Sequence, residues 1–198
     1  MIPYFLYFGL ITIASVGISG VTALIFEIDF LSGFGYTWIA IIAVVLLDGL
    51  TATVCRLLPA KFADHEKKFF QVSAKEKKFY EKLKIRKWKD LIPEIGQFTG
   101  FRKNKLVDPK SVAYLDRFLL ECCYGQIGHI SSLFSGFLIL FLFPIADFWF
   151  AIAIPVAIVN AFMNLPSLFI LRYNAYKLNI LRKSTIKKQE RTKSKVNE

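Results

Sequence analysis

The chain has 198 residues, of which 55% are hydrophobic, and a formal net charge of +11. All 26 lysines and arginines lie in two blocks, 17 between Arg56 and Arg117 and 9 between Arg172 and Lys195. Two long cation-free apolar segments exclude a nucleic-acid-binding protein and are typical of a membrane protein. The expected partners are membrane lipids with anionic headgroups, or a phosphorylated cosubstrate.

The first 60 residues predict a transmembrane hairpin. Ile2–Phe26 is uncharged and long enough for the ~20 residues that a membrane-spanning helix needs. Its glycines and serines predict close packing against another helix. We expect Glu27–Tyr36 to be a loop. The second span is expected over Thr37–Leu58, where Pro59 ends it.

Residues 61–110 form a basic polar region between the apolar segments. Aromatic and aliphatic residues recur at helical intervals from Asp64 to about Lys89, opposite a face of lysine and glutamate, which predicts a helix. The pattern favours a helix lying on the membrane surface, with packing on a small cytosolic core as the alternative. Pro93 and two glycines predict irregular structure over Ile92–Asn104.

Residues 111–178 predict a polar helix followed by a second hairpin. Ser111 is a candidate cap for the helix that follows. The third span extends through the apolar Ile130–Phe143, and a short turn leads to the fourth, Phe148–Leu171. Its apolar run is interrupted by four residues that are expected to kink the helix, namely Pro155, Asn160, Asn164 and Pro166. Asn160 and Asn164 share one face, and we expect their amides to pack against a partner helix. The tail, 179–198, is basic and expected to be disordered.

The chain is therefore predicted to be an all-α integral membrane protein with four transmembrane helices in two hairpins. Cations lie in the central loop and the tail, whereas the two short loops carry only acidic charge. By the positive-inside rule, both termini and the 61–110 loop face the cytosol.

Several polar residues lie within or beside the spans. His129 stands where a polar helix enters the bilayer, and a neutral imidazole there can act as a general base or form a structural hydrogen bond. Asp48 lies near the middle of a span, where an acid must be neutral, paired or facing a wet cavity. With Asp48, the residues Gln126 and Asn160 are candidates for an intramembrane polar site. Three cysteines in this arrangement predict neither a metal site nor disulfides.

Three stretches, in this order, resemble the glycosyl-4,4'-diaponeurosporenoate acyltransferase family: FYEKLKIRKWKDLIPEIGQF, LDRFLLECCYGQIGH and NLPSLFILRYNAYKL. The resemblance spans about Pro59 to Leu178. It implies transfer of a fatty acyl group to a sugar hydroxyl of a glycolipid, in bacterial carotenoid biosynthesis. It also implies an acyl donor such as acyl-CoA as cosubstrate, no bound cofactor, and a bacterial cell membrane location.

The resemblance also implies site residues. His129 is the implied catalytic base, with Glu121 as its orienting acid. The implied substrate-binding residues come from the first and third stretches and are Arg86, Lys87, Trp88, Lys89, Asp90, Asn164, Arg172, Tyr173 and Asn174. The chain departs from the family pattern at four positions, where it has Tyr124, Gln126, Leu171 and Ala175.

Three functions follow from these observations. The first is a membrane-embedded O-acyltransferase acting on a glycolipid or related lipid acceptor. The second, favoured by Tyr124 and Gln126, is a non-catalytic membrane scaffold or partner subunit. The third, suggested by Asp48 and the interrupted fourth span, is a small lipid or solute transporter.

Overall fold

The computed structural model describes residues 2–93, 106–142 and 146–196, and within these ranges the regular structure is entirely helical. Among these described residues, four helices are long and apolar enough to cross a membrane, as predicted. Large apolar side chains remain exposed along them, with Leu24 84% and Phe141 81% accessible. In a bilayer these side chains face lipid, so the chain is a multi-pass membrane protein.

The chain divides into two compact units, which are described separately. The first comprises Met1–Leu57, Asp90–Pro93 and Gly128–Ser167, and the second comprises Leu58–Lys89, Glu94–Ile127 and Leu168–Glu198. Two long helices, α5 (Val112–Ser135) and α7 (Trp149–Val196), contribute to both units.

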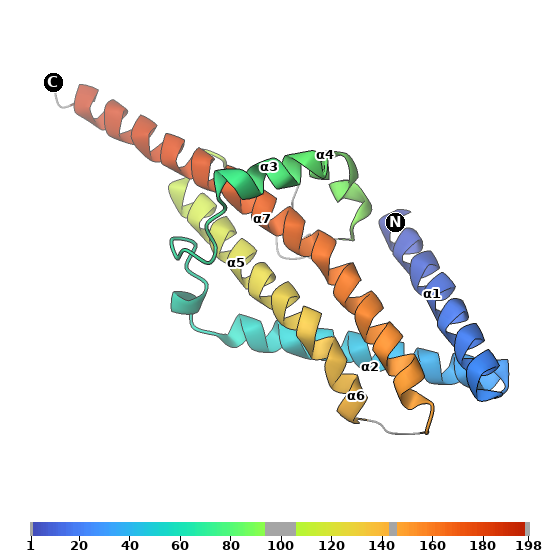
Figure 1. Cartoon of the computed structure of the whole chain (residues 1–198). Coiled ribbons are helices and arrows are strands. Elements are labelled where there is room, and N and C mark those ends of the chain that lie inside the picture. The colour runs from blue at the N-terminus through green and yellow to red at the C-terminus, as the bar shows by residue number, and fades with distance from the viewer. Residues whose placement is uncertain (1, 94–105, 143–145, 197–198) are drawn as a thin grey trace. The chain divides into compact units, whose positions relative to one another are not determined.

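Helices α1 (Ile2–Phe26) and α2 (Phe30–Leu57) form the predicted first hairpin of the first unit (Figure 1). The small residues of α1 that pack are serines: Ser15 and Ser19 are fully buried, and Ser19 Oγ donates to Thr37 Oγ1 at 3.1 Å. The α1 glycines Gly9, Gly17 and Gly20 have open space around them instead. Close helix packing is therefore confirmed, with hydroxyl side chains at the contact.

The loop between α1 and α2 is shorter than the predicted Glu27–Tyr36. Helix α2 begins at Phe30 because Asp29 Oδ2 accepts a hydrogen bond from the Ser32 backbone N–H at 2.9 Å, which caps the first turn. Glu27 takes a left-handed φ of 52° and reverses the chain. Gly33 is a packing residue within α2, since a Cβ there would lie 3.5 Å from the Ser19 carbonyl oxygen.

In the first unit, α5 is followed by a short 3-10 turn, η4 (Gly136–Leu138), and by α6 (Ile139–Leu142). Trp149, at the start of α7, is fully buried and donates its indole N–H to the Ile139 carbonyl at 3.1 Å. Together with apolar residues of α2, these elements form the core of the unit. This hydrogen bond joins the end of the third span to the start of the fourth.

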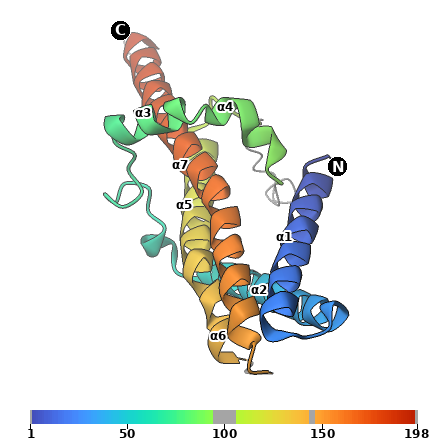
Figure 2. The same ribbon diagram turned by 45° about the vertical axis from the view of Figure 1, so that its right-hand side comes forward.

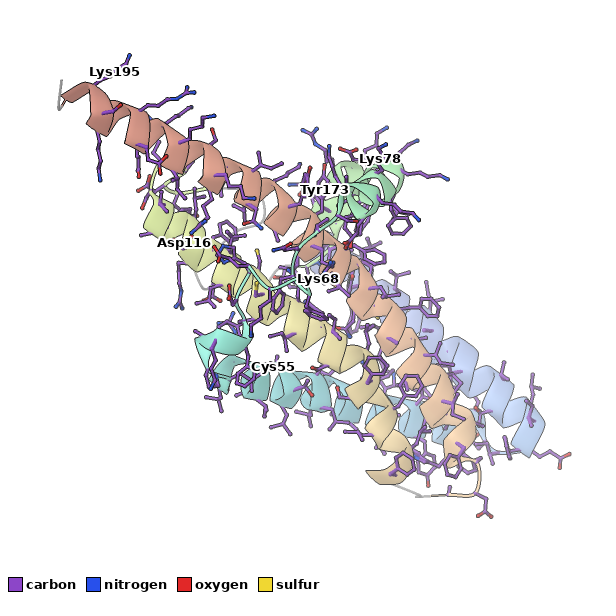
Figure 3. All side chains as sticks on the ribbon, turned by 60° about the vertical axis from the view of Figure 1, so that its left-hand side comes forward. Cys55, Lys68, Lys78, Asp116, Tyr173 and Lys195 are labelled. Atoms are coloured by element: carbon purple, nitrogen blue, oxygen red, sulfur yellow. The ribbon has the colours of Figure 1, made fainter. Side chains whose placement is uncertain are left out.

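Helix α7 continues through Pro155 and Pro166 without a break, and the kink expected at these residues stays a prediction. Proline removes one backbone hydrogen bond, and membrane helices tolerate this where neighbouring groups compensate. The helix also extends to Val196, where a disordered tail was expected. In the second unit, Arg182 of this extension pairs with Asp116 of α5. Figure 3 shows charged side chains projecting from α7 up to Lys195.

The predicted helix over Asp64–Lys89 is shorter and broken. Helix α3 covers Ala74–Lys82, α4 covers Ile85–Trp88, and the 3-10 turns η1 (Ala60–Phe62) and η2 (Lys89–Leu91) flank them. Asp64 Oδ1 accepts from the Glu66 N–H at 2.8 Å, a local turn that competes with helix. Lys84, with a φ of 53°, separates α3 from α4.

One face of α3 packs within the second unit. Tyr80 is only 3% exposed, and its ring lies 5.7 Å from that of Phe169 and 6.5 Å from that of Tyr173. Phe69 and Phe79 remain about half exposed. This packing matches the alternative of a helix on a small core, and attachment of the exposed face to the membrane surface stays a prediction. Most of Ile92–Asn104 lies outside the described residues.

Helix α5 begins at Val112 as predicted, because Ser111 Oγ accepts from the Tyr114 N–H at 3.2 Å. Its buried apolar face in the second unit packs against α7, with Leu115, Leu119 and Cys122 facing Ala175 and Leu178. The contact places α5 beside α7 in this unit, as both views show (Figures 1 and 2).

Candidate functional site

Asp48, the acid in the second span, is hydrogen-bonded on both of its oxygens. In the first unit, Asn160 Nδ2 donates to Asp48 Oδ1 at 3.3 Å, and Asn164 Nδ2 donates to Asp48 Oδ2 at 3.1 Å. The two asparagines stand one turn apart on α7 and therefore share a face of the helix. Their amide donors compensate the cost of removing a polar group from water.

His129 belongs to the same set of side chains. Its Nδ1 lies 2.8 Å from Asn164 Oδ1. Because the Asn164 amide group donates to the carboxylate of Asp48, its oxygen is directed at the imidazole, and an oxygen can only accept. Nδ1 therefore carries the proton, and Nε2 carries the free lone pair.

Asn160 is held by further contacts in the first unit. Its Nδ2 also lies 3.4 Å from the Ser132 carbonyl oxygen, and Asn164 Nδ2 lies 3.1 Å from the Asn160 carbonyl oxygen. Gly136 makes room for this amide, since a Cβ there would stand 2.8 Å from Asn160 Nδ2. We call Asp48, Asn160, Asn164 and His129 the polar cluster.

In the polar cluster His129, a potential base, contacts the Asn164 amide, which in turn contacts the acid Asp48. A histidine whose Nδ1 proton is held by an oriented group presents Nε2 as a proton acceptor, which is the arrangement used to activate hydroxyl and thiol groups. Here the orienting group is Asn164 and the acid behind it is Asp48, whereas the resemblance implied Glu121 as the orienting acid. Asn160 and Asn164, which were expected to pack against a partner helix, hold the cluster together.

Glu121 lies in the second unit and is 9% exposed. Its Oε1 forms an ion pair of 2.8 Å with the Arg117 guanidinium one turn earlier on α5. Its observed partner is therefore a cation on its own helix.

Arg172 organises the second unit. Its guanidinium donates to Glu76 Oε1 at 2.5 Å and to Glu76 Oε2 at 3.0 Å, and to Gln126 Oε1 at 3.1 Å. It also donates to the carbonyl oxygens of Phe69 and Gln71, at 3.0 and 3.4 Å. Such a saturated, bidentate arginine holds two segments together, so the donors that an anionic substrate would need are already engaged.

The charge of Glu76 follows from this contact. Burial alone would raise the pKa of the Glu76 carboxyl, but hydrogen bonds from Arg172 and Tyr80 and the positive charge of Arg172 outweigh it, and the pKa is lowered. Burial and the hydrogen bond to Glu76 raise the pKa of the Tyr80 hydroxyl, which therefore remains protonated. The pair Glu76–Arg172 is ionised at neutral pH.

Three further predicted site residues of the second unit are buried or half-buried, namely Gln126, Tyr173 and Asn174. Tyr173 is 3% exposed, and the Lys177 ammonium lies 4.1 Å from the centre of its ring. Asn174 is half-buried on the neighbouring face of α7. Gln126 is fully buried, and its Nε2 has no hydrogen-bond partner among the described residues.

The predicted residues of the first stretch lie on α4 and η2. Arg86 and Lys87 are exposed, and Trp88 donates its indole N–H to the Leu83 carbonyl at 2.9 Å, which fixes the ring against the preceding turn. Lys89 and Asp90 follow at the start of η2. Arg86 and Lys87 are cations presented to solvent by a short helix.

Glu76 is an organising residue that sequence analysis missed. A local signal was present, because Ser73 and Glu76 form the serine-x-x-glutamate pattern of a helix start, and Ser73 Oγ accepts from the Glu76 N–H at 3.1 Å. The carbonyl groups of Phe69 and Gln71 carried no such signal, since any residue type presents the same backbone oxygen.

The model of one protein family, described as glycosyl-4,4'-diaponeurosporenoate acyltransferase, matches residues 64–184. The chain belongs to this family. The match covers more than half of the chain and includes His129, Asn160 and Asn164, whereas Asp48 precedes it. The name of this family describes an acyltransferase of carotenoid biosynthesis, which agrees with the predicted acyl transfer.

No curated protein and no solved structure matches the chain. The four departures from the family pattern all fall in the second unit. Gly125 lies so close to Leu171 that a Cβ would stand 2.8 Å from Leu171 Cδ1, and Ala175 is buried in the α5–α7 contact. Tyr124 donates its hydroxyl to the Leu58 carbonyl at 2.8 Å. Leu171 and Ala175 therefore lie in the α5–α7 contact, whereas Tyr124 bonds a backbone carbonyl outside the helices.

Proposed function

We propose that this protein is a membrane-embedded O-acyltransferase that moves a fatty acyl group from a donor such as acyl-CoA to a hydroxyl of a glycolipid or related lipid acceptor. Family membership supports the acyl transfer. The observation that carries the proposal for a site is the 2.8 Å contact between His129 Nδ1 and Asn164 Oδ1. With Asn164 oriented by Asp48, this contact leaves Nε2 as a base.

In the proposed reaction His129 is the catalytic base. Nε2 takes the proton from the acceptor hydroxyl as its oxygen attacks the carbonyl carbon of the acyl thioester. The carbon–sulfur bond then breaks, the proton passes from the imidazolium to the departing thiolate, and an ester and a free thiol result. Asn164 and Asp48 are positioning residues, because they hold the imidazole tautomer and do not touch the reacting atoms.

The phosphates of the donor are assigned to Arg86 and Lys87. These side chains are exposed, whereas the Arg172 guanidinium already donates to Glu76, Gln126 and two carbonyl oxygens. Exposed cations bind phosphate groups with little desolvation cost. The proposed location is a bacterial cell membrane, with both termini and the 61–110 loop on the cytosolic side, where acyl-CoA is present.

The test is acyl transfer by purified protein in detergent or nanodiscs. His129→Ala should lower the rate by about 10²- to 10⁴-fold, the usual contribution of a general base. His65→Ala is the matched control, since His65 is the only other histidine of the chain and lies in the second unit. Transfer by His129→Ala at the wild-type rate would show that the base lies elsewhere.

A binding measurement separates the enzyme from a scaffold. Thermal unfolding is followed with and without palmitoyl-CoA. An acyl donor that binds the folded protein raises the melting temperature. No shift with palmitoyl-CoA or shorter acyl-CoAs, together with no transfer, would favour the scaffold.

A further inference from the structure

The last part of α7, in the second unit, has one packed face. Arg182 pairs with Asp116 of α5, and Gln189 Nε2 donates to the Lys110 carbonyl oxygen at 3.3 Å. The α7 residues that contact α5 or the segment before it recur every three or four positions, and they are Leu178, Arg182, Thr185 and Gln189. This spacing places them on one side of the helix.

The opposite side of the same helix carries exposed cations. Lys183, Lys187 and Arg191 are spaced four residues apart and form a row. Lys187 lies about 200° round the helix from both Thr185 and Gln189, at 100° per residue, so the row faces away from α5. Ile180, 53% exposed, lies in the same row. We call Ile180, Lys183, Lys187 and Arg191 the basic stripe.

The height of the basic stripe above the bilayer follows from helix geometry. The apolar run of the fourth span ends at Leu171. The rings of Tyr80 and Tyr173 lie 6.5 Å apart at this level, and tyrosine is enriched at the membrane boundary. Since each residue of a helix adds 1.5 Å, Lys187 and Lys195 lie about 24 and 36 Å along α7 from Leu171.

Anionic lipid headgroups lie too low to bind the outer part of the stripe. The headgroup layer is about 5–8 Å thick on each face of a bilayer, and a surface charge is screened over about 8 Å at physiological salt. Even at a tilt of about 40°, the upper end of the range for membrane helices, Lys187 stands about 18 Å above the hydrocarbon. Lys187 and Arg191 therefore face a soluble anionic partner.

Ile180 distinguishes two kinds of soluble polyanion. It lies about 14 Å along α7 from Leu171, so the hydrocarbon does not cover it. An exposed aliphatic side chain among cations is typical of a protein interface, where an apolar centre is surrounded by a polar rim. A nucleic-acid backbone offers such a side chain no apolar contact. The basic stripe therefore fits an acidic protein surface.

We propose that the basic stripe docks an acidic acyl carrier protein, which delivers the acyl group as a thioester. The inference rests on the proposed function and names the class of its acyl donor. Carboxylates of the carrier protein face Lys183, Lys187 and Arg191, and an apolar side chain of the carrier meets Ile180. Complementary charge of this kind speeds the encounter of two proteins and fixes their register.

The first experiment measures binding without catalysis. Purified full-length protein in phosphatidylcholine nanodiscs is titrated with palmitoyl-loaded acyl carrier protein, and binding is followed by surface plasmon resonance. We expect saturable binding that weakens as salt is added, because exposed charges are screened. Absence of binding at low salt would overturn the proposal.

Two charge reversals on α7 test the stripe itself. Lys187→Glu should weaken binding of the carrier protein about tenfold, because like charges then face each other. Lys193→Glu is the matched control, since it makes the same change on an exposed residue of the same helix that lies about 240° round from Lys187 and outside the stripe. Ile180→Ala should weaken binding without changing its salt dependence. Equal losses in the two lysine variants would show a response to net charge alone and overturn the proposal.

A fluorophore identifies which anion contacts the stripe. It is attached to Ser184→Cys, an exposed position beside Lys183, in a protein whose three buried native cysteines are replaced by alanine. Its emission should shift when palmitoyl-loaded carrier protein is added and stay unchanged when phosphatidylglycerol is included in the nanodiscs. A shift with phosphatidylglycerol, or with an RNA duplex and not with the carrier protein, would overturn the proposal.

Docking and acyl transfer fail separately. Lys187-dependent binding of the carrier protein by a protein that transfers no acyl group would uphold the stripe and refute the enzyme. Transfer from palmitoyl-CoA without binding of the carrier protein would do the reverse. Where both hold, Lys187→Glu should raise KM for the palmitoyl-loaded carrier protein about tenfold and leave kcat unchanged, because docking precedes the chemical step.

Discussion

Asp48 accepts a hydrogen bond from the side-chain amide of Asn164, with 3.1 Å between Oδ2 and Nδ2. The two residues are 116 positions apart. This contact fixes which end of the amide faces His129, and so determines which imidazole nitrogen carries the proton. Asp48, within a membrane span, thereby orients the His129 imidazole through the side chain of Asn164.

Asp48→Asn should lower the rate of acyl transfer about 10- to 100-fold, because an amide nitrogen at this place cannot accept a hydrogen bond and the Asn164 amide is no longer held in one orientation. The substitution keeps the shape of the side chain. Initial rates measured across a range of pH test it, and the apparent pKa of the rate profile should also change. A wild-type profile in Asp48→Asn would show that Asp48 serves packing alone.

Gly136→Ala should impair activity more than stability. The new Cβ would lie 2.8 Å from Asn160 Nδ2 and would displace that amide from Asp48 and from the Ser132 carbonyl. We expect a loss of about tenfold in rate, equal to about 1.4 kcal/mol, with little change in melting temperature. Gly128→Ala, on α5 with nothing within 4 Å of its added Cβ, should behave as wild type. Equal rates in the two variants would contradict the role of Gly136.

The pair Glu76–Arg172 should make the second unit sensitive to acid. The pKa of Glu76 is lowered in the folded protein from an ordinary value of 4.5, so its contribution to stability is complete above that value. The contribution is lost as the pH falls below 4.5 toward the folded pKa, since the unfolded chain then binds the proton more readily.

Glu76→Gln should remove this part of the pH dependence and lower the melting temperature at neutral pH. A hydrogen bond to a charged group contributes about 1.5–3 kcal/mol, which is the expected loss. Melting is followed by tryptophan fluorescence from neutral pH to pH 3. Glu81→Gln is the control, because Glu81 forms an exposed pair with Lys77 on the same helix, and such pairs contribute at most about 1 kcal/mol. Identical acid profiles in Glu76→Gln and wild type would refute the assignment.

The topology can be tested with single cysteines. In a variant with Cys55, Cys122 and Cys123 replaced by alanine, Lys195→Cys should react with a membrane-impermeant maleimide only after the cytosolic side is opened. Glu27→Cys should react from outside in intact cells, because positively charged segments stay in the cytosol. Labelling of both cysteines from the same side would contradict the predicted orientation.

The helical spans and the start of α5 could be predicted from the sequence. Apolar composition and length are local properties, and Ser111 caps α5 through its own near neighbours. The start of α2 was also encoded locally, by Asp29 and Ser32, although the two glycines that follow suggested a loop. Family resemblance pointed to His129 as a base, because such motifs are read from the order of residues alone.

The rotation of the helices and the contacts between their side chains could not be predicted, because they depend on how the helices pack. Asp48, His129 and Asn164 lie on three helices, and Glu76 and Arg172 are 96 positions apart. Hydropathy does not specify which face of one span lies against another, because lipid accepts any apolar face. The partners are selected by the need of buried polar groups for hydrogen bonds, and that need is met only when the helices are packed.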